Sequence, residues 1–229
     1  MGIFIALTII FLWGAHLVYI LVFSNLDFSS PFTYFHVLLQ TYLFTGLFIT
    51  AHDSMHGTVA KNRRVNNTIG RLSTLAYAFL SYKTLTKKHY LHHRFPATDQ
   101  DPDFSSRSTN FFVWWFDFMR SYVTWYQLLA MAITFNVLLI WFTELKLLLY
   151  WVLPAILSTL QLFYFGTFLP HRRPFHDEMQ PHYARTQKRN HLWAMLSCYF
   201  FGYHWEHHES PTTPWWKLYQ IKQKPDQTV

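Results

Sequence analysis

Charged residues are scarce in this sequence of 229 residues. Asp, Glu, Lys and Arg together make up 14% of it, whereas a soluble domain usually carries about 25%. Hydrophobic residues reach 51% and aromatic residues 21%. This composition argues against a water-soluble protein, and we expect a protein that lies in a membrane.

The sequence also has a single cysteine and no Lys or Arg near its start. Cys198 is the only cysteine, which excludes an internal disulfide and fits a reducing compartment. No Lys or Arg precedes Lys61, whereas a cleavable signal peptide begins with a basic stretch. We therefore expect the first apolar run to remain as a membrane anchor.

Four apolar runs are long enough to cross a bilayer, whose hydrocarbon core takes about 20 helical residues. They are Ile3–Phe23, Phe32–Ala51, Trp125–Phe142 and Leu147–Leu169, the last with an expected bend at Pro154. A soluble core of four buried helices would need amphipathic partners, and the rest of the sequence has too few. The expected fold class is all-α: an integral membrane protein with four transmembrane helices, forming a single domain over residues 1–229.

The basic residues predict how the chain is threaded. If the four runs cross in turn, every Lys and Arg except Lys146 lies on one side, together with both termini. Loops rich in Lys and Arg stay in the cytoplasm, so we expect this side to be cytoplasmic, in a cytoplasmic or thylakoid-type membrane. The formal charge of +7 on that side favours contact with anionic membrane lipid or an acidic protein. Nucleic acid is not an expected partner, because the basic residues are scattered among apolar segments.

Three shorter apolar segments fall on the same side. They are Ile69–Tyr82, Phe111–Tyr122 and Leu192–Tyr203. None is long enough to span, so we expect Phe111–Tyr122 to be a helix at the membrane interface. The other two are expected to lie at the interface or to dip partly into the helix bundle.

The 14 histidines include three closely spaced groups, which we call the histidine boxes. Their sequences are HDSMH, HYLHH and HWEHH, and on a helix the positions i, i+3 and i+4 share a face. All three boxes fall on the cytoplasmic side of the expected threading, as does His171 after the fourth run. The box residues are His52, His56, His89, His92, His93, His204, His207 and His208.

Packing alone gives no reason to gather eight imidazoles at one depth of a membrane protein. Metal ligation does, because neutral imidazole binds Fe, Zn and Cu. Eight ligands, or nine with His171, are too many for one ion, so two metal ions are expected. The other five histidines (His16, His36, His176, His182 and His191) are interpreted as ordinary polar side chains.

Several carboxylates lie near the boxes but lack the Glu-x-x-His pattern of soluble di-iron bundles. We expect Asp53, Asp101, Asp103 and Glu206 to accept hydrogen bonds from the ring nitrogens that do not bind metal. For the DQDPD run, which begins at Asp99, a polar turn made rigid by Pro102 is an equal alternative.

Longer motifs around the boxes resemble those of the membrane fatty-acid desaturase and hydroxylase superfamily, and within it the bacterial and cyanobacterial β-carotene ketolases. The motifs are HDSMHGTV from His52, KKHYLHHRFPATDQDPDF from Lys87, FGTFLPHRRP from Phe165 and CYFFGYHWEHHESPTTPWWKL from Cys198. The likeness runs roughly from Phe35 to Leu218, and these motifs are more specific than the boxes alone.

The resemblance implies two non-haem iron ions bound by the eight box histidines and His171. It also implies oxidation of C4 of a β-ionone ring, with β-carotene or a related carotenoid as substrate, O2 as co-substrate and a ferredoxin-type electron donor. The chain has no flavin or nicotinamide motif, so electrons must come from outside it. Tyr77, Phe79, Phe201 and Trp205 are candidates to line the substrate channel, although core packing or interface anchoring explains any one of them as well.

Other functions remain open at this stage. A carotenoid ring 3-hydroxylase, a fatty-acid desaturase and an alkane hydroxylase would use the same metal site. A membrane metal-binding protein would also gather histidines, but it would need a polar path across the bilayer, and the four runs lack a stripe of ionisable residues.

Overall fold

The computed structural model describes residues 1–188 and 190–222. Within these residues the regular structure is helical and contains no strand, which confirms the expected all-α class. The main helices are α1 (Gly2–Phe23), α2 (Pro31–Met55), α3 (Arg63–Ala78), α4 (Tyr82–Arg94), α5 (Phe111–Tyr122), α6 (Trp125–Leu138), α8 (Leu153–Phe163) and α10 (His191–Cys198). The shorter ones are α7 (Glu144–Leu147), η1 (Leu148–Val152), η2 (Tyr164–Phe168), α9 (Leu169–His171), η3 (Asp177–Met179), α11 (His204–Glu209), η4 (Trp215–Lys217) and α12 (Leu218–Ile221).

Polar capping residues set where several helices begin. The Ser30 side chain accepts the N–H of Phe32 at the start of α2, where Pro31 needs no hydrogen-bond partner for its nitrogen. Asn62 caps α3 and Asn110 caps α5 in the same way, each accepting two backbone N–H groups. These short polar residues therefore separate apolar stretches into distinct helices.

One long helix is built from five consecutive segments, α7, η1, α8, η2 and α9, running without a break from Glu144 to His171. Its segments η1 and η2 are π-helical, a rare form that occurs mainly as single turns inside α-helices. The π-helical turn η1 ends two residues before Pro154, where we expected a bend. The second π-helical turn lies just before His171.

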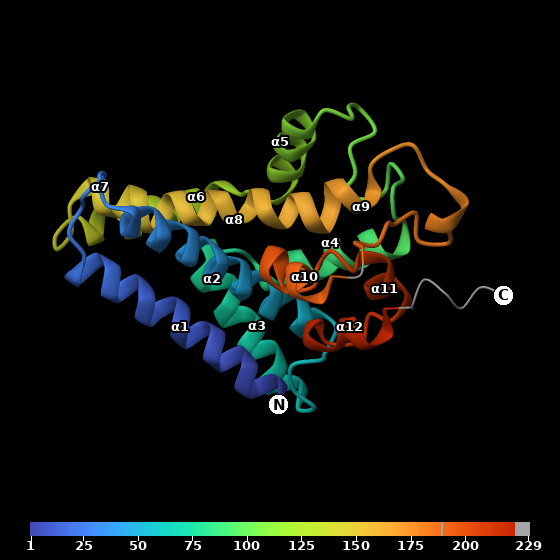
Figure 1. Ribbon diagram of the computed structural model, residues 1–229, viewed down its shortest axis with the longest axis horizontal. Coiled ribbons are helices and arrows are strands. Elements are labelled where there is room, and N and C mark those ends of the chain that lie inside the picture. Colours follow the sequence, from blue (N-terminus) through green and yellow to red (C-terminus); the bar gives the residue numbers. More distant parts are fainter. Residues whose placement is uncertain (189, 223–229) are drawn as a thin grey trace.

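Helix α2 lies at the centre of the molecule and packs against α1, α3 and α8 (Figure 1). The most apolar window of α2 is 56% buried, whereas that of α1 is only 22% buried. Figure 1 also shows the N-terminus at the end of the molecule where α3, α11 and α12 lie, with the α1–α2 connection and α7 at the opposite end.

Three helices are long and apolar enough to cross a membrane: Gly2–Phe23, Pro31–Met55 and Glu144–His171. The expected third run is shorter than predicted, because α6 has only 14 residues and a turn follows at Leu139. Its rise of about 21 Å is less than the hydrocarbon core of about 30 Å. By length, the structure thus supports three of the four predicted spans.

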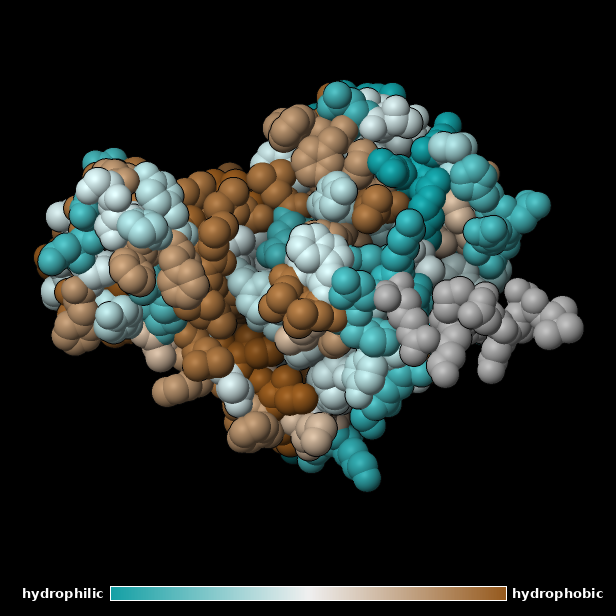
Figure 2. All heavy atoms as spheres, viewed as in Figure 1, coloured by the Kyte–Doolittle hydropathy of each residue, from teal (hydrophilic) through white to brown (hydrophobic). Residues whose placement is uncertain are grey.

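The predicted interfacial segments are helical, with shifted bounds for two of them. Phe111–Tyr122 is α5 as predicted, while α3 begins earlier than Ile69 at Arg63, and α10 ends at Cys198 instead of continuing to Tyr203. Figure 2 shows hydrophobic residues across the middle of the visible face, with hydrophilic residues gathered mainly at the end near α9. This division is typical of a protein whose middle contacts lipid.

Candidate metal centre

The last turn of α2 carries the first histidine box. His52 lies in this turn and is buried, and His56 follows one turn later as the residue that ends the helix. Neither ring nitrogen of His52 has a hydrogen-bond partner among the described residues. A buried imidazole left unpaired in this way costs free energy unless a ligand satisfies it.

The second and third boxes lie on α4 and α11. On α4, His89 and His93 are four residues apart and share a face, while His92 points to a different set of partners. On the six-residue helix α11, His204 and His208 share a face and His207 lies beside them. Three helices from distant parts of the sequence thus present their imidazoles to one region.

Together with His171, the box histidines form two groups. In each group the candidate ligand atoms all lie within 4.8 Å of one another. The five-histidine cluster consists of His52, His56, His89, His93 and His207, and the four-histidine cluster consists of His92, His171, His204 and His208. Each box contributes to the five-histidine cluster, and the second and third boxes also contribute to the four-histidine cluster.

The spacing of the ring nitrogens fits a shared cation. An ion about 2.1 Å from each nitrogen would place neighbouring nitrogens about 3.0–3.4 Å apart. In the five-histidine cluster, His93 Nε2 lies 3.1 Å from His89 Nε2 and 3.0 Å from His207 Nε2, which agrees with this range. The distance between His56 Nε2 and His89 Nε2, 2.6 Å, is shorter than this range.

In the four-histidine cluster, the Nε2 atoms of His92, His204 and His208 form a triangle with sides of 3.1, 3.1 and 3.4 Å. A given Nε2 is either a donor or an acceptor, so three mutual contacts cannot all be hydrogen bonds. A cation at the centre of the triangle satisfies all three nitrogens. The residues present therefore fit metal ions in both clusters.

His171 completes the four-histidine cluster from the end of the long helix. Its Nδ1 lies 2.9 Å from the carbonyl oxygen of Tyr183, to which it donates. This bond leaves Nε2 as the unprotonated nitrogen, and Nε2 has no partner among the described residues. A carbonyl on one ring nitrogen and a free second nitrogen are typical of a metal-binding histidine.

Burial keeps four of the imidazoles on α4 and α11 neutral, which is the form that binds metal. On α4 and α11, burial and the neighbouring histidines lower the pKa of His89, His204, His207 and His208 well below its usual value. Near neutral pH, protons therefore compete only weakly with a metal ion for these four residues.

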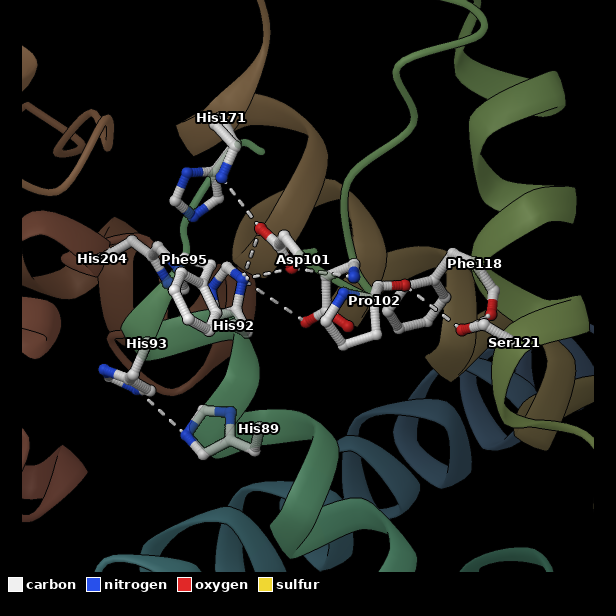
Figure 3. Close-up of polar contacts among 12 residues, drawn as sticks. His89, His92, His93, Phe95, Asp101, Pro102, Phe118, Ser121, His171 and His204 are labelled. Atoms are coloured by element: carbon white, nitrogen blue, oxygen red, sulfur yellow. Dashed lines mark hydrogen bonds and ion pairs between the residues drawn. The ribbon is translucent and has the colours of Figure 1, made fainter. Parts of the chain in front are cut away.

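The carboxylates differ in what they contact. Asp101 lies 3.0 Å from His92 Nδ1 through each of its two oxygens, and it also accepts the backbone N–H groups of Ala97 and Asp103. Asp103 Oδ2 is 3.9 Å from His92 Nδ1, and its other oxygen accepts the hydroxyl of Tyr122. In Figure 3, His92 lies between Asp101 on one side and His204 on the other.

Asp53 and Glu206 do not make the hydrogen bonds to histidine that we expected. Asp53 is 3.7 Å from His52 Nδ1, too far for a hydrogen bond, and instead accepts the backbone N–H of Trp215 at 3.1 Å. Glu206 accepts the hydroxyl of Thr186 and forms a buried ion pair of 3.1 Å with Lys222. The reason is helical geometry, because a residue two positions from His204 and His208 points away from their face.

A largely apolar cavity of about 540 Å³ opens onto both clusters. His52 and His89 of the five-histidine cluster line it, as do His92 and His204 of the four-histidine cluster. The rest of its wall comes mainly from α2, α5, α6 and the long helix Glu144–His171. This volume is within the range of small-molecule sites, so an apolar compound could reach the histidines from among the helices.

Two of the four predicted channel residues line this cavity. They are Tyr77, whose hydroxyl is 2.7 Å from Ser158 Oγ, and Phe201. Phe79 and Trp205 are not part of the lining. Phe79 ends α3 in a left-handed conformation, and the Trp205 ring packs beside His182.

Comparison with known proteins agrees with this geometry. The family model "Fatty acid desaturase" matches residues 29–129 and 118–227, which together cover most of the chain. The chain belongs to the fatty acid desaturase family. The helices long enough to cross a membrane and the buried histidine clusters are thus found in a member of a family of membrane enzymes.

Curated relatives of this fatty acid desaturase family member carry names that refer to carotenoids. "Zeaxanthin 4-ketolase" of Chlamydomonas reinhardtii is 40% identical, over 97% of this chain and 53% of the relative. "Beta-carotene ketolase" of Paracoccus sp. (strain PC1) is 42% identical, over 78% of this chain and 74% of the relative. "Beta-carotene 4-ketolase" of Protosiphon botryoides is 34% identical, over 95% of this chain and 62% of the relative. The chain therefore spans about half to three-fifths of the length of the algal relatives, and no solved structure matches it.

The sequence analysis did not identify every residue that shapes this site. Tyr122 contacts Asp103, Tyr183 contacts His171, and Gly166 lies against Phe201. Gly166 stands five residues before His171, in a motif already associated with the metal centre. This position in the motif was the sequence signal that could have pointed to Gly166. The contacts of Tyr122 and Tyr183 depend on tertiary packing and have no local signature.

Proposed function

We propose that this protein is a β-carotene 4-ketolase with two non-haem iron ions. The single observation that carries the proposal is the cavity, which joins apolar walls among the helices to imidazoles from both clusters. A carotenoid is a long hydrocarbon with no polar group to bind, so recognition must come from apolar shape. The names of the relatives from algae and from Paracoccus support the same substrate class.

The nine clustered histidines are the proposed iron ligands, and Asp101 and Asp103 support His92 from its far side. When bound, iron would supply the activation of O2. In each round O2, two electrons and two protons convert one C–H bond to C–OH and release one water. A second round at the same carbon gives a gem-diol, which loses water to form the ketone.

Positioning of the ring is the task of the protein. C4 of the β-ionone ring is allylic, so its C–H bonds are among the weaker ones in the substrate. The apolar wall of the cavity would hold the ring beside His52 and His204 and would exclude bulk water from the reaction. This chemistry gives echinenone when one ring is oxidised and canthaxanthin when both rings are oxidised.

Electrons would come from a separate carrier, which we propose to be an acidic ferredoxin-type protein. Exposed basic residues lie just before α3 and along α3 and α4, close in sequence to the first and second boxes. They are Lys61, Arg63, Arg64, Arg71, Lys83 and Lys87. A positive face of this kind attracts an acidic partner and speeds its docking.

We also propose that the chain crosses the membrane four times, with the histidine boxes on the cytoplasmic side. His171 at the end of the long helix lies with the box histidines, whereas α7 at its start contacts the far end of α1 through Lys146 and Leu21. The chain must therefore return from the box side between α5 and α7. Only α6 and the turn at residues 139–143 are available for this crossing, although α6 alone is short.

Expression in a bacterium that makes β-carotene tests the proposal. Extracts analysed by chromatography and mass spectrometry should contain echinenone and canthaxanthin, and a His204→Ala variant produced at the same level should leave β-carotene unchanged. Hydroxylation at C3 would indicate a ring hydroxylase, and a new double bond or hydroxyl in an acyl or alkyl chain would indicate a desaturase or alkane hydroxylase. Bound iron without any O2 consumption would favour a metal-binding protein.

A further inference from the structure

Phe201 lies where the cavity meets the two histidine clusters. Its ring centroid is 5.0 Å from that of His52 in the five-histidine cluster and 5.5 Å from that of His204 in the four-histidine cluster. Both contacts are edge-to-face, and all three residues line the cavity. A substrate ring that approaches these histidines through the cavity therefore meets Phe201.

The turn that carries Phe201 is fixed by unusual backbone geometry. Tyr199 and Phe200 both have positive φ values, 48° and 60°, which are uncommon for residues with bulky side chains. The turn is closed by a 2.7 Å hydrogen bond from the N–H of Phe201 to the carbonyl oxygen of Cys198. Strained backbone of this kind concentrates at functional sites, where the surrounding structure maintains it.

A second contact holds the same turn from the other side. Gln187 donates its backbone N–H to the carbonyl oxygen of Gly202 at 2.8 Å, and a Cβ on Gly202 would lie only 2.1 Å from Gln187 Oε1. The turn thus has little freedom to shift, and the position of the Phe201 ring is set by what it packs against.

Gly166 provides that packing surface. It lies in the π-helical segment η2, and a Cβ at this position would be 2.0 Å from Phe201 Cε1 and 2.6 Å from Cδ1. Ordinary contact begins near 3.4 Å, so a methyl group at residue 166 would displace the ring by about 1.4 Å. Gly166 itself also lines the cavity.

A displacement of this size matters for which carbon is oxidised. C3 and C4 of a β-ionone ring are bonded neighbours, separated by about 1.5 Å, the length of a carbon–carbon single bond. A shift of the cavity wall by that distance exchanges the two carbons relative to the histidine clusters. Reactivity alone favours the allylic C4, whereas positioning decides whether C3 is reached at all.

We propose that Phe201, seated against Gly166, sets how far the ring enters and thereby selects C4 over C3. This inference rests on the proposed ketolase function. Phe201 acts by direct contact with the substrate, and Gly166 acts through Phe201 by leaving room for its ring. The pair is thus a specificity determinant of the site and binds no metal.

The test compares Gly166→Ala, Phe201→Leu and the double variant with Gly14→Ala as a matched control. Gly14 also lies in a membrane-spanning helix, but a Cβ there would meet nothing within 4 Å. Each variant is produced with β-carotene, and three quantities are measured: iron per chain, the thermal unfolding temperature, and the ratio of C3-oxygenated to C4-oxygenated product. We expect this ratio to rise roughly tenfold or more in both single variants, the scale of one methylene group in an apolar pocket, and to stay unchanged in Gly14→Ala.

The double variant distinguishes loss of the contact between residues 166 and 201 from general destabilisation of the protein. Leucine lacks the Cε1 and Cζ atoms of Phe201, and its two flexible methyl groups can turn away from the added methyl group. Phe201→Leu should therefore restore the iron content and unfolding temperature lost in Gly166→Ala. An altered product ratio should persist in the double variant, because the aromatic wall is missing.

Unchanged product ratios in a folded, iron-loaded Phe201→Leu protein would overturn the inference, even if its rate is lower. That result also decides the matter if Gly166→Ala fails to fold. A wild-type chain that forms no ketone would instead refute the proposed function, so the two failures are distinguishable.

Discussion

His92 Nδ1 lies 3.0 Å from both carboxylate oxygens of Asp101, while His92 Nε2 faces His204 and His208. Burial lowers the pKa of His92, but the carboxylates of Asp101 and Asp103 outweigh this effect and raise it to about 9. An environment that favours a proton on this ring also favours a metal cation bound to it. The Asp101–His92 pair therefore orients a proposed metal ligand and would increase its affinity for a positive ion.

We predict that Asp101→Asn weakens the metal centre without unfolding the protein. Asparagine retains one acceptor oxygen but removes the negative charge beside His92, and the loss of such a partner typically costs 10- to 100-fold in metal affinity or activity. Asp99→Asn is the matched control, because Asp99 is exposed in the same loop. Iron per chain and ketone formation are measured for both. Equal values in the two variants would show that Asp101 has no part in metal binding.

The division of the histidines predicts that the two proposed metal ions can be removed separately. His171→Ala alters only the four-histidine cluster, and His56→Ala alters only the five-histidine cluster. Each should reduce the iron content from about two ions per chain to about one and abolish ketone formation, because both clusters face the cavity. His16→Ala should change neither, since His16 contacts Gln40 and His36 instead. Loss of all iron in either ligand variant would contradict two separable sites.

Metal removal should also reduce stability. Within residues 1–188 and 190–222, both ring nitrogens of His52 and one of His171 lack a hydrogen-bond partner, so the metal-free protein contains buried polar atoms that are not satisfied there. A ligand present at a thousand times its Kd adds about 4 kcal/mol to the free energy of unfolding. We therefore expect a chelator to lower the thermal unfolding temperature by several degrees.

Adding back different metals refines this experiment. Iron should restore both the unfolding temperature and ketone formation. Zinc, which binds imidazole but has no redox chemistry, should restore only the unfolding temperature. A chelated protein with unchanged stability would argue that the clusters are empty in the native protein.

Glu206 should prove structural despite its place inside the third box. Its carboxylate pairs with Lys222 and accepts the hydroxyl of Thr186. Glu206→Gln leaves the Lys222 ammonium buried without its partner, which typically costs about 3–5 kcal/mol of folding free energy. Glu206→Gln combined with Lys222→Met should recover much of this loss. Iron per folded chain should stay at the wild-type value in both variants, and a loss of iron would instead make Glu206 a ligand.

The sequence was a better guide to which histidines gather at the candidate site than to how they are divided between the two clusters. The i, i+3, i+4 spacing identifies the box histidines, because one helical turn places them on a common side. It does not reveal that neighbours such as His92 and His93 belong to different clusters. That division follows from how α4 packs against α11, and this packing depends on contacts between residues more than 100 positions apart.

The same limit applies to the helices and the cavity. Apolar length predicted α1, α2 and the long helix well, because crossing a membrane constrains each of them locally. It overestimated α6, since nothing in a run of apolar residues marks the turn at Leu139. The contact between Gly166 and Phe201 is likewise tertiary, so the sequence pointed to Phe201 but not to the glycine that positions it.

Membrane threading can be tested by labelling single cysteines, because the native Cys198 should not interfere. Burial raises the pKa of the Cys198 thiol and shields it from reagents. Ser29, Ser106 and Glu144 are exposed and lie in the α1–α2 connection, before α5 and at the start of α7, respectively. Each is replaced by cysteine in turn, and intact cells are treated with a membrane-impermeant maleimide.

Four crossings with cytoplasmic boxes predict that Ser29→Cys and Glu144→Cys react in intact cells, whereas Ser106→Cys reacts only after the membrane is permeabilised. Glu144 is the decisive position. Its helix ends at His171, beside histidines that follow α2 and α3, so the chain must have crossed between Ser106 and Glu144 if the long helix spans the membrane. If Glu144→Cys, like Ser106→Cys, is labelled only after the membrane is permeabilised, α6 does not cross the membrane. The long helix would then have to lie along the membrane surface, and the cavity would open toward the interface instead of the bilayer interior.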